Sequence, residues 1–362
     1  MIEGLTQLFD AAQPGLEELR RRLDEILGDT GSGKLLEAIP LQLPNPRAYR
    51  LRFEIDSQLR SLIVKRLEPA IAHRNYLLLT RWLPAVRLGQ NAPTLVGIAA
   101  DREGHCVWHV YEDLGDWALS NQSNSLPCIK LAVELIAQLH LRFANHPLLA
   151  ECRLHGGDLG AGFFSANVCD ATRCLEAMRR APLQLSRDQA GLCDRLLERL
   201  GRLSDEQAVR VQALEELGGP ETLLHGDLWT KNMFVMPTPT GLLARLIDWD
   251  HVAVGHVSYD LSTFLLRFPS ERRLQILEFY RDAIASTGWR LPPIADLNAL
   301  FETAELARAA NCIIWPAIAL LRERVEWPFD ALAEVERWFE GFEPVLRDQN
   351  GVSVSRAAHE PV

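Results

Sequence analysis

Apolar and polar residues follow two different patterns along the chain, and the first pattern is that of strands. From residue 49 to residue 55, apolar and charged residues alternate strictly, which predicts a strand buried on one face. Residues 56–58 predict a turn, and residues 59–65 are expected to form the return strand. Further elements are expected around this hairpin: a surface helix over residues 5–27, a helix over 69–83, and strands over 94–100 and 106–112. The first 112 residues should therefore hold a small antiparallel sheet.

The helical spacing of apolar residues dominates the rest of the chain. Helices are expected over residues 129–145, 171–180, 187–200, 205–217, 258–267, 270–287, 296–324 and 328–346. One hairpin, with strands over 233–235 and 242–248, interrupts them. The sequence thus predicts the α+β class, with a sheet-rich lobe over residues 1–112, a connection over 113–117, a helical lobe over 118–348 and a polar tail over 349–362.

Composition and charge agree with a two-lobed enzyme and exclude several other classes. With 362 residues, 48% of them apolar and 24% charged, the chain is globular rather than disordered. Its net charge of −10 argues against a nucleic-acid partner. No apolar run reaches the roughly 18 residues of a membrane span, and the first residues lack the pattern of a signal peptide. Seven cysteines without any C-x-x-C pair predict reduced thiols in a cytoplasmic protein.

Two segments resemble catalytic motifs only in part. Residues 28–35 nearly form a phosphate-binding P-loop, but the last position is Leu35 instead of Ser or Thr, and a helix precedes it. We interpret them as a connection between a helix and a strand. Residues 155–158 read His-Gly-Gly-Asp, without an asparagine five residues after the aspartate. We interpret them as a glycine-rich surface loop that is a candidate border of a substrate site.

The strongest motif is the sequence of residues 224–232, followed by residues 246–250. It places Asp227 five residues before Asn232, and after a short hairpin it places Asp248 at the end of an apolar strand. Phosphoryl transfer needs a carboxylate that accepts the proton of a hydroxyl, together with oxygen ligands that hold magnesium on the nucleotide phosphates. The alternative, in which Asp227 caps a helix and Asp248 lies in a turn, requires several coincidences at once.

At these residues the chain resembles the aminoglycoside phosphotransferases and choline-kinase-like enzymes, which share the protein-kinase fold. Their pattern H-G-D-x-x-x-x-N and I-D-W-[DE] is matched by His225, Gly226, Asp227, Asn232, Asp248, Trp249 and Asp250. The later Tyr-Asp-Leu of the family is matched over residues 259–261. The resemblance covers about residues 45–266 and implies a two-lobed fold with a nucleotide-binding sheet.

The resemblance also implies roles for single residues. Asp227 would be the catalytic base, Asn232 and Asp248 would bind magnesium, and His225 and Asp260 would support the catalytic loop, with Asp250 beside them. Lys65 would contact the α- and β-phosphates of ATP or GTP. Residues 112–114, which are Glu112, Asp113 and Leu114, would form the hinge that binds the base through backbone groups.

The chain departs from the family pattern in two places. Residues 69–83 contain no acidic residue to pair with Lys65, and Asn75 and Tyr76 lie where a glutamate is expected. The loop over residues 45–49 has no glycine, so we hypothesise that Arg47 supplies phosphate-binding charge there. Two functions therefore stay open: an active small-molecule kinase, and a kinase-like protein that binds a ligand or partner with little or no catalysis.

The acceptor implied by the resemblance is a hydroxyl group of a small molecule such as an aminoglycoside, choline or a sugar. Residues 296–348 contain eleven acidic and five basic residues. Such an excess would attract a cationic acceptor, although solvated helix faces have the same composition. The tryptophans of this region are candidates for a substrate platform or for core packing: Trp289, Trp315, Trp327 and Trp338.

Overall fold

Internal contacts divide the chain into two compact units in the computed structural model, which describes residues 2–5, 13–28, 33–41, 46–181, 185–323, 325 and 327–347. The first unit comprises Met1–Leu135 and Lys231–Asp250. The second unit comprises Ile136–Thr230 and His251–Val362. The predicted tail over residues 349–362 and residues 29–32 of the P-loop-like segment lie outside the described residues.

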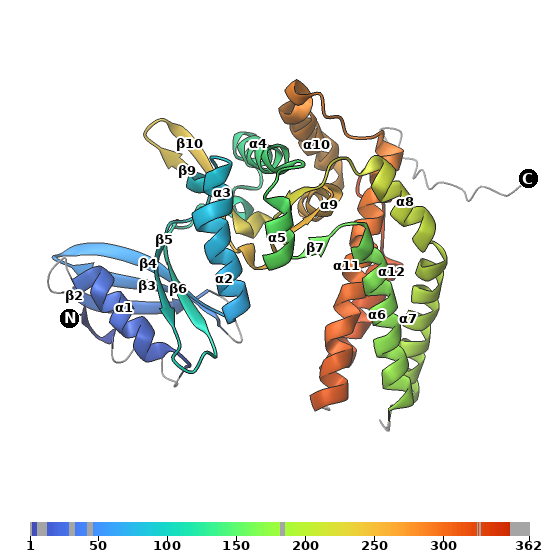
Figure 1. Cartoon of the computed structure of the whole chain (residues 1–362), viewed down its shortest axis with the longest axis horizontal. Coiled ribbons are helices and arrows are strands. Elements are labelled where there is room, and N and C mark those ends of the chain that lie inside the picture. The colour runs from blue at the N-terminus through green and yellow to red at the C-terminus, as the bar shows by residue number, and fades with distance from the viewer. Residues whose placement is uncertain are drawn as a thin grey trace, which may run out of the picture. The chain divides into compact units, whose positions relative to one another are not determined.

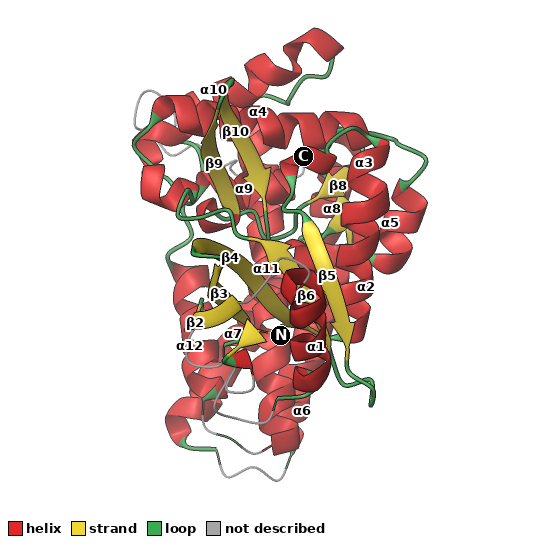
Figure 2. Cartoon of the chain, turned by 90° about the vertical axis from the view of Figure 1, so that its left-hand side faces the viewer, coloured by secondary structure: helices red, strands yellow, loops and turns green. Residues whose placement is uncertain are grey.

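A six-stranded sheet forms the centre of the first unit (Figure 2). Its strands lie in the order β1-β2-β3-β4-β6-β5, and all neighbours are antiparallel except β1 and β2. The bounds are β1 (Ile2–Glu3), β2 (Gly33–Pro40), β3 (Ala48–Ile55), β4 (Gln58–Leu67), β5 (Leu95–Ala100) and β6 (Val107–Glu112). The four strands predicted in this region are confirmed, whereas β1 and β2 were not predicted.

Strand β2 contains the last three residues of the P-loop-like segment. Gly33, Lys34 and Leu35 pair with β3, and Lys34 approaches Glu3 within 3.9 Å. These residues therefore belong to a strand and do not begin a helix, as a phosphate-binding P-loop would require. This agrees with the interpretation of the segment as a connection.

Helix α1 (Leu16–Gly28) covers one face of this sheet. Leu19 and Leu23 are fully buried against Leu51 and Phe53 of β3. Each such leucine contributes about 1.5–3 kcal/mol through removal from water. The helix begins at Leu16 because Gly15 with φ of +69° precedes it; the prediction began it at residue 5, and residues 6–12 lie outside the described residues.

The helix predicted over residues 69–83 is confirmed as a continuous helical segment with an unusual centre. It consists of α2 (Pro69–Leu77), a π-helical segment η2 (Leu78–Trp82) and α3 (Leu83–Ala85). π-Helical segments are rare and occur frequently at functional sites. This segment carries Asn75 and Trp82, both buried.

The hairpin of β9 (Met233–Thr238) and β10 (Gly241–Leu246) belongs to the first unit. Val235 N donates to the carbonyl of Trp117 at 3.0 Å, and Asn91 Nδ2 donates to the carbonyl of Ala244 at 3.0 Å. These contacts explain why the first unit does not end at residue 112, the boundary that the sequence predicted. The unit also contains the start of α4 (Leu126–Phe143), which the sequence predicted over residues 129–145.

The second unit is mostly helical (Figure 1). Its helices are α5 (Leu149–His155), α6 (Ala161–Arg180), α7 (Arg187–Asp205), α8 (Gln207–Leu217), α9 (Ser258–Leu265), α10 (Ser270–Ile284), α11 (Ile294–Glu323) and α12 (Pro328–Glu340). Helix α6 begins ten residues earlier than predicted, and α12 ends six residues earlier, at Glu340. A three-stranded sheet in the order β7-β11-β8 was not predicted; its strands are β7 (Asp158–Leu159), β8 (Thr222–Leu224) and β11 (Ala253–Gly255).

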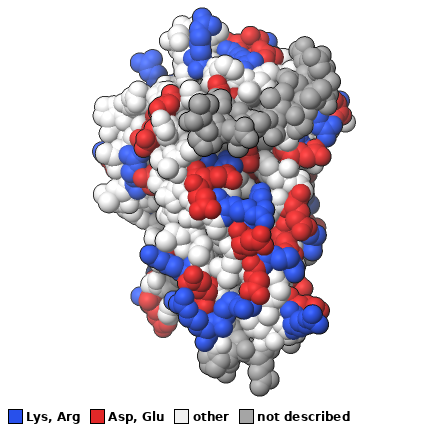
Figure 3. Space-filling view, turned by 90° about the vertical axis from the view of Figure 1, so that its right-hand side faces the viewer, with Lys and Arg blue, Asp and Glu red and all other residues white. Residues whose placement is uncertain are grey.

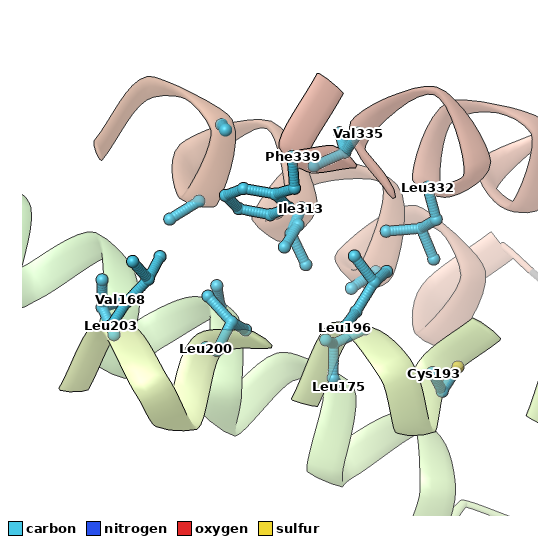
Figure 4. Close-up of a cluster of buried hydrophobic side chains, with 14 of the residues drawn as sticks. Val168, Leu175, Cys193, Leu196, Leu200, Leu203, Ile313, Leu332, Val335 and Phe339 are labelled. Carbon is cyan, nitrogen blue, oxygen red and sulfur yellow. The ribbon is translucent and has the colours of Figure 1, made fainter. Parts of the chain in front are cut away.

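The main core of the second unit lies between α6, α7, α11 and α12. Figure 4 shows Leu196 and Leu200 of α7 pointing toward Phe339 of α12 and Ile313 of α11. Helix α11 is long and apolar enough to cross a membrane by length and composition alone, and 61% of its most apolar window is buried inside the protein. Packing against α6, α9 and α12 accounts for these apolar residues.

Candidate active site

The alternation of side chains in β3 and β4 creates a cavity on the open face of the first sheet. Leu62 and Val64 of β4 point toward α1 and are buried in its core. Ile63 and Lys65 therefore point to the opposite face. There they line a cavity of about 420 Å³ together with Arg50 of β3. This volume lies within the usual range of small-molecule sites.

Six of the predicted site residues line this cavity, and Arg47 is among those that do not. The lining includes Lys65, Glu112, Asp113, Leu114, Asn232 and Asp248. Arg47 is exposed and is not among the lining residues, and its carbonyl accepts a hydrogen bond from Arg66 N at 2.7 Å. The phosphate-binding role of Arg47 stays a prediction. Its neighbour in the loop, residue 45, lies outside the described residues.

Lys65 lies between two carboxylates of the segment after β10. Its Nζ donates to Asp248 Oδ1 at 2.5 Å and to Asp250 Oδ2 at 2.7 Å. Burial acts to lower the pKa of Lys65, but the charges of Asp248 and Asp250 outweigh it and raise the pKa. The lysine is therefore a permanent cation at neutral pH, which phosphate binding requires.

Asp250 provides the partner that the sequence lacks on the helix after Lys65. Asn75 Nδ2 of α2 donates to Asp250 Oδ1 at 2.9 Å, and Arg74 Nη1 donates to the Asp250 carbonyl at 2.6 Å. Asn75 is only 3% exposed, so this hydrogen bond is protected from water. In place of a helix glutamate that binds the lysine directly, an amide of the helix holds a carboxylate from a distant loop.

Asp248 has a backbone conformation that few residues adopt. Its φ of +62° is in the left-handed region, which costs a residue with a side chain about 1 kcal/mol or more. In this conformation the carboxylate of Asp248 contacts Lys65, and such conformations cluster at functional sites. Asn232 is 3% exposed, and its carbonyl accepts a hydrogen bond from Ile247 N at 2.9 Å, which joins the two predicted metal ligands through neighbouring segments.

The side chains of the predicted hinge are occupied by structural contacts. Asp113 accepts hydrogen bonds from Ser61 Oγ at 2.6 Å and forms an ion pair with Arg50 Nε at 2.8 Å. Glu112 accepts from Thr94 Oγ1 at 2.8 Å and also from Arg245. These contacts fix the backbone of the hinge. Binding of a base by main-chain groups of these residues stays a prediction.

A histidine–tyrosine pair lies under the same face of the sheet. His109 Nδ1 and the Tyr111 hydroxyl of β6 are 2.8 Å apart, and Tyr111 lines the cavity. Burial, partly offset by Asp250, lowers the pKa of His109 to about 4. Burial and the charges of Asp250 and Asp248 raise the pKa of Tyr111. Both side chains are therefore neutral at pH 7.

The second unit contains the catalytic loop of the predicted motif, which follows the buried strand β8. Asp260 at the start of α9 is fully buried and accepts hydrogen bonds from His225 N at 2.7 Å and Gly226 N at 3.0 Å. Burial acts to raise the pKa of Asp260, but contacts with His140 and His225 outweigh it and lower the pKa. The carboxylate is thus ionised and braces the loop.

The loop bends at Gly226, which no other residue can replace without a shift. Its φ is +80°, and a Cβ built there would lie 1.9 Å from the carbonyl oxygen of His251. Asp227 N then donates to His225 Nδ1 at 3.3 Å, so this ring nitrogen carries the lone pair. Trp229 N donates to the Asp227 carbonyl at 2.8 Å. The partly buried Asp227 is therefore held in a tight turn.

The His-Gly-Gly-Asp segment has a structural role in the second unit. Asp158 pairs with Val254 in the three-stranded sheet, and its carboxylate accepts from Gly160 N at 2.9 Å and contacts Arg153 Nε at 3.1 Å. Since His155 ends α5 and Asp158 begins β7, the predicted loop is limited to Gly156 and Gly157.

Many acidic side chains between positions 296 and 348 form ion pairs with arginines. Glu302 contacts Arg210, Glu336 contacts Arg195 and Glu343 contacts Arg347. Figure 3 shows acidic and basic side chains interleaved on the face that it draws. Trp338 packs against the core, whereas Trp315 and Trp327 are 67% and 46% exposed. The cationic acceptor and the tryptophan platform stay predictions.

Sequence reasoning did not assign Arg50, Arg74 or Asn75 to the site, although it named Asn75 at the position of the expected glutamate. Arg50 and Asn75 line the cavity, and Arg74 holds the backbone of Asp250. The alternation of β3 could have identified Arg50, since it pairs with Ile63 beside Lys65. Within the described part of the chain, no group of three or more His, Cys, Asp or Glu side chains could hold a metal by itself.

Comparisons with known proteins agree with this reading of the fold. The model of the phosphotransferase enzyme family (APH) matches residues 45–295. None of the curated proteins matches the sequence. Solved structures that resemble the chain include an ethanolamine kinase of Plasmodium vivax, with 13% identity, a TM-score of 0.57 and coverage of 94% of this chain and 98% of that one.

Two antibiotic phosphotransferases are similar to the chain to a comparable degree. APH(2")-IIia in complex with GDP and kanamycin has 14% identity, a TM-score of 0.58 and coverage of 90% of this chain and 99% of that one. Spectinomycin phosphotransferase APH(9)-Ia in complex with ADP and spectinomycin has 14% identity, a TM-score of 0.51 and coverage of 87% and 90%. At this identity the likeness shows the fold, and it confirms the predicted α+β, kinase-like architecture.

Proposed function

Because the chain belongs to the phosphotransferase enzyme family and is a small-molecule kinase, we propose that it transfers the γ-phosphate of ATP or GTP to a hydroxyl group of a small molecule. The observation that carries this proposal is Lys65, which lies at 2.5 and 2.7 Å from two carboxylates in a cavity of nucleotide-binding size. The similar structures that contain ADP or GDP support a nucleotide donor.

The residues of the cavity suit a nucleotide triphosphate. Lys65 would bind the α- and β-phosphates, and Ile63 and Leu114 would contact the base while backbone groups of the hinge recognise its edge. The contact between Lys65 and Asp250 would keep the ammonium in place when phosphate arrives. An amide-anchored carboxylate therefore replaces the missing helix glutamate, which favours an active enzyme over a binding protein without catalysis.

The oxygen donors of the first unit also suit magnesium. Asp248 and Asn232 offer a carboxylate and an amide oxygen, and magnesium takes few protein ligands when phosphate oxygens and water complete its shell. When bound, the ion would neutralise charge on the phosphate oxygens. In the second unit, Asp227 would accept the proton of the attacking hydroxyl and orient it, with its loop held by Asp260.

Binding of the donor is tested by the melting temperature with ATP or GTP, with and without magnesium. A ligand at 100 times its Kd stabilises the folded protein by about 2.7 kcal/mol. We expect a magnesium-dependent increase for the wild-type protein that is lost in Asp248→Ala. If neither ATP nor GTP at millimolar concentration with magnesium raises the melting temperature of the wild-type protein, the proposed donor site is refuted.

Transfer itself is tested with Asp227→Asn in an assay of nucleotide turnover with a library of hydroxyl acceptors. We expect turnover to fall by a factor of about 100 or more, while nucleotide still raises the melting temperature as in the wild-type protein. The neutral amide keeps the size of the side chain but is a far weaker base. Retained turnover would show that Asp227 is not the base.

A further inference from the structure

Arg267 lies next to the catalytic loop in the second unit. It follows α9, its side chain is exposed, and its Cζ lies 3.9 Å from the centroid of the Trp229 ring. The backbone of Trp229 is bonded to the Asp227 carbonyl, so the stacked guanidinium is attached to the same turn as the proposed base. Stacking on an aromatic face holds a guanidinium in one orientation while its edge stays available.

The guanidinium of Arg267 has no carboxylate partner among the described residues. Its one hydrogen bond within the described chain runs from Nε to the Thr263 carbonyl at 3.3 Å. Arg308, in contrast, binds the buried Glu305, and Arg153 binds Glu221 at 2.7 Å. The two Nη groups of Arg267 thus form an unused fork of donors.

The charges around Arg267 leave its positive charge poorly compensated. Partial burial lowers its pKa, and Arg308 lowers it as well, while Glu305 and Asp227 act in the opposite direction. Glu305 is already bound by Ser262 Oγ at 2.7 Å and by Arg308. Arg273 is a further cation close enough to repel Arg267. An anion at this place would relieve the repulsion.

We propose that the acceptor of this kinase carries an anionic group, with a carboxylate as the best match, and that Arg267 binds it beside Asp227. The planar fork of a guanidinium matches the two oxygens of a carboxylate in a bidentate pair. The subsite would place the hydroxyl of the acceptor at the base while its charge is held on the Trp229 stack. This inference rests on the proposed phosphotransferase function and specifies its substrate class.

The test uses sets of acceptors that share a carbon skeleton and differ in charge. One set is gluconate, glucose and glucosamine, and a second is glycerate, glycerol and 2-amino-1,3-propanediol. The rate of ADP or GDP formation and the melting temperature are measured for the full-length protein with magnesium nucleotide at constant ionic strength. We expect the anionic member to be preferred in at least one set.

Substitutions then assign the preference to Arg267. Arg267→Gln should lower kcat/KM for the anionic member by about 10- to 100-fold, the usual value of one charged hydrogen-bonded pair. It should change the neutral member far less. Arg267→Lys should restore part of the rate, and Arg267→Glu should shift the preference toward the cationic member. Arg202→Gln, which removes the same charge from an exposed pair on α7, is the matched control.

Each outcome separates this inference from the proposed function. Nucleotide must still raise the melting temperature of every variant, which shows that the variant is folded and binds the donor. Suppose that nucleotide raises the melting temperature of wild type and Arg267→Gln. If both proteins then prefer the neutral or the cationic member to the same degree, the anion subsite is refuted. It is also refuted if a nucleotide-binding protein responds to no anionic member. Absence of nucleotide binding in the wild type would instead refute the proposed function itself.

Discussion

The contact between Asn75 and Asp250 allows a direct test of how this chain holds Lys65. The side-chain nitrogen of Asn75 lies 2.9 Å from Asp250 Oδ1 and is shielded from water. Asn75→Asp has almost the same size, but it replaces the donor with a second carboxylate. We expect this variant to be less stable than the wild type because two anions then face each other at hydrogen-bonding distance.

The magnitude follows from two limits. Two unit charges about 3 Å apart repel by about 5 kcal/mol at an effective dielectric constant of 20. The introduced carboxyl can avoid this by taking up a proton, which at pH 7 costs about 4 kcal/mol for a carboxyl of ordinary pKa. Lys65, at 2.7 Å from Asp250, offsets part of either cost. We therefore expect a loss of about 2–4 kcal/mol in the free energy of unfolding.

The loss should depend on pH in one direction. The neighbouring carboxylate raises the pKa of the introduced carboxyl in the folded protein, so the penalty is complete at pH values above that pKa. It shrinks as the pH falls below that pKa, and it is gone near pH 4, where the carboxyl is protonated in the unfolded chain as well. Urea unfolding at pH 7, 6, 5 and 4 should thus show a difference from the wild type that is largest at pH 7 and smallest at pH 4.

A reciprocal exchange makes the test specific. Combining Asn75→Asp with Asp250→Asn restores one amide and one carboxylate, so the double variant should recover about 2 kcal/mol relative to Asn75→Asp alone. Asn311→Asp adds the same charge at an exposed position of α11 and should change stability by less than about 0.5 kcal/mol. If Asn75→Asp behaves like Asn311→Asp, and the exchange recovers nothing, Asn75 does not hold Asp250.

Two further predictions concern the catalytic loop and the floor of the cavity. Gly226→Ala should lower the free energy of unfolding in urea by about 3 kcal/mol or more and abolish turnover, because its Cβ would lie 1.9 Å from a carbonyl oxygen. The control is Gly162→Ala, whose Cβ would meet no atom within 4 Å. Equal stability of the two variants would contradict the geometry. His109 has a folded pKa of about 4 against an ordinary 6.5, so its contribution is complete above pH 6.5 and falls by about 3 kcal/mol as the pH falls to 4. His109→Gln should flatten the stability profile between these values, and an unchanged slope would refute the assignment.

The sequence predicted those elements whose periodicity is long enough to read. The alternation over residues 49–55 identified β3 and the face that α1 covers. Strands β7, β8 and β11 have two or three residues each, which is too few for any period to appear. Strand β2 was missed for another reason: it is mostly exposed and has a bulge between Leu35 and Glu37, so its apolar residues do not alternate.

Site residues that are close together in the sequence could be predicted, whereas contacts between residues far apart in the sequence could not. The spacing of Asp227, Asn232 and Asp248 is a sequence property, and it identified the motif. The partner of Lys65 is 185 residues away at Asp250, and no spacing rule connects them. A signal did exist in Asn75, a polar residue on the same helix face as the buried Ala72 and Leu78, since a buried amide must find a partner.

Lys65 of the first unit and Arg267 of the second unit differ in whether a carboxylate of the chain pairs with them, and this difference constrains the chemistry. Lys65 has two carboxylates of its own, one of which, Asp248, is also the proposed magnesium ligand. If Asp248 turns toward the metal, Asp250 remains as the partner that keeps Lys65 charged and in place. Arg267 forms no ion pair with a carboxylate among the described residues, although the charges of Glu305 and Asp227 act on it. Within the described residues, Lys65 thus has carboxylate partners where a nucleotide would bind its phosphates, whereas Arg267 forms no such pair beside the proposed base, where the anion of an acceptor would complete it.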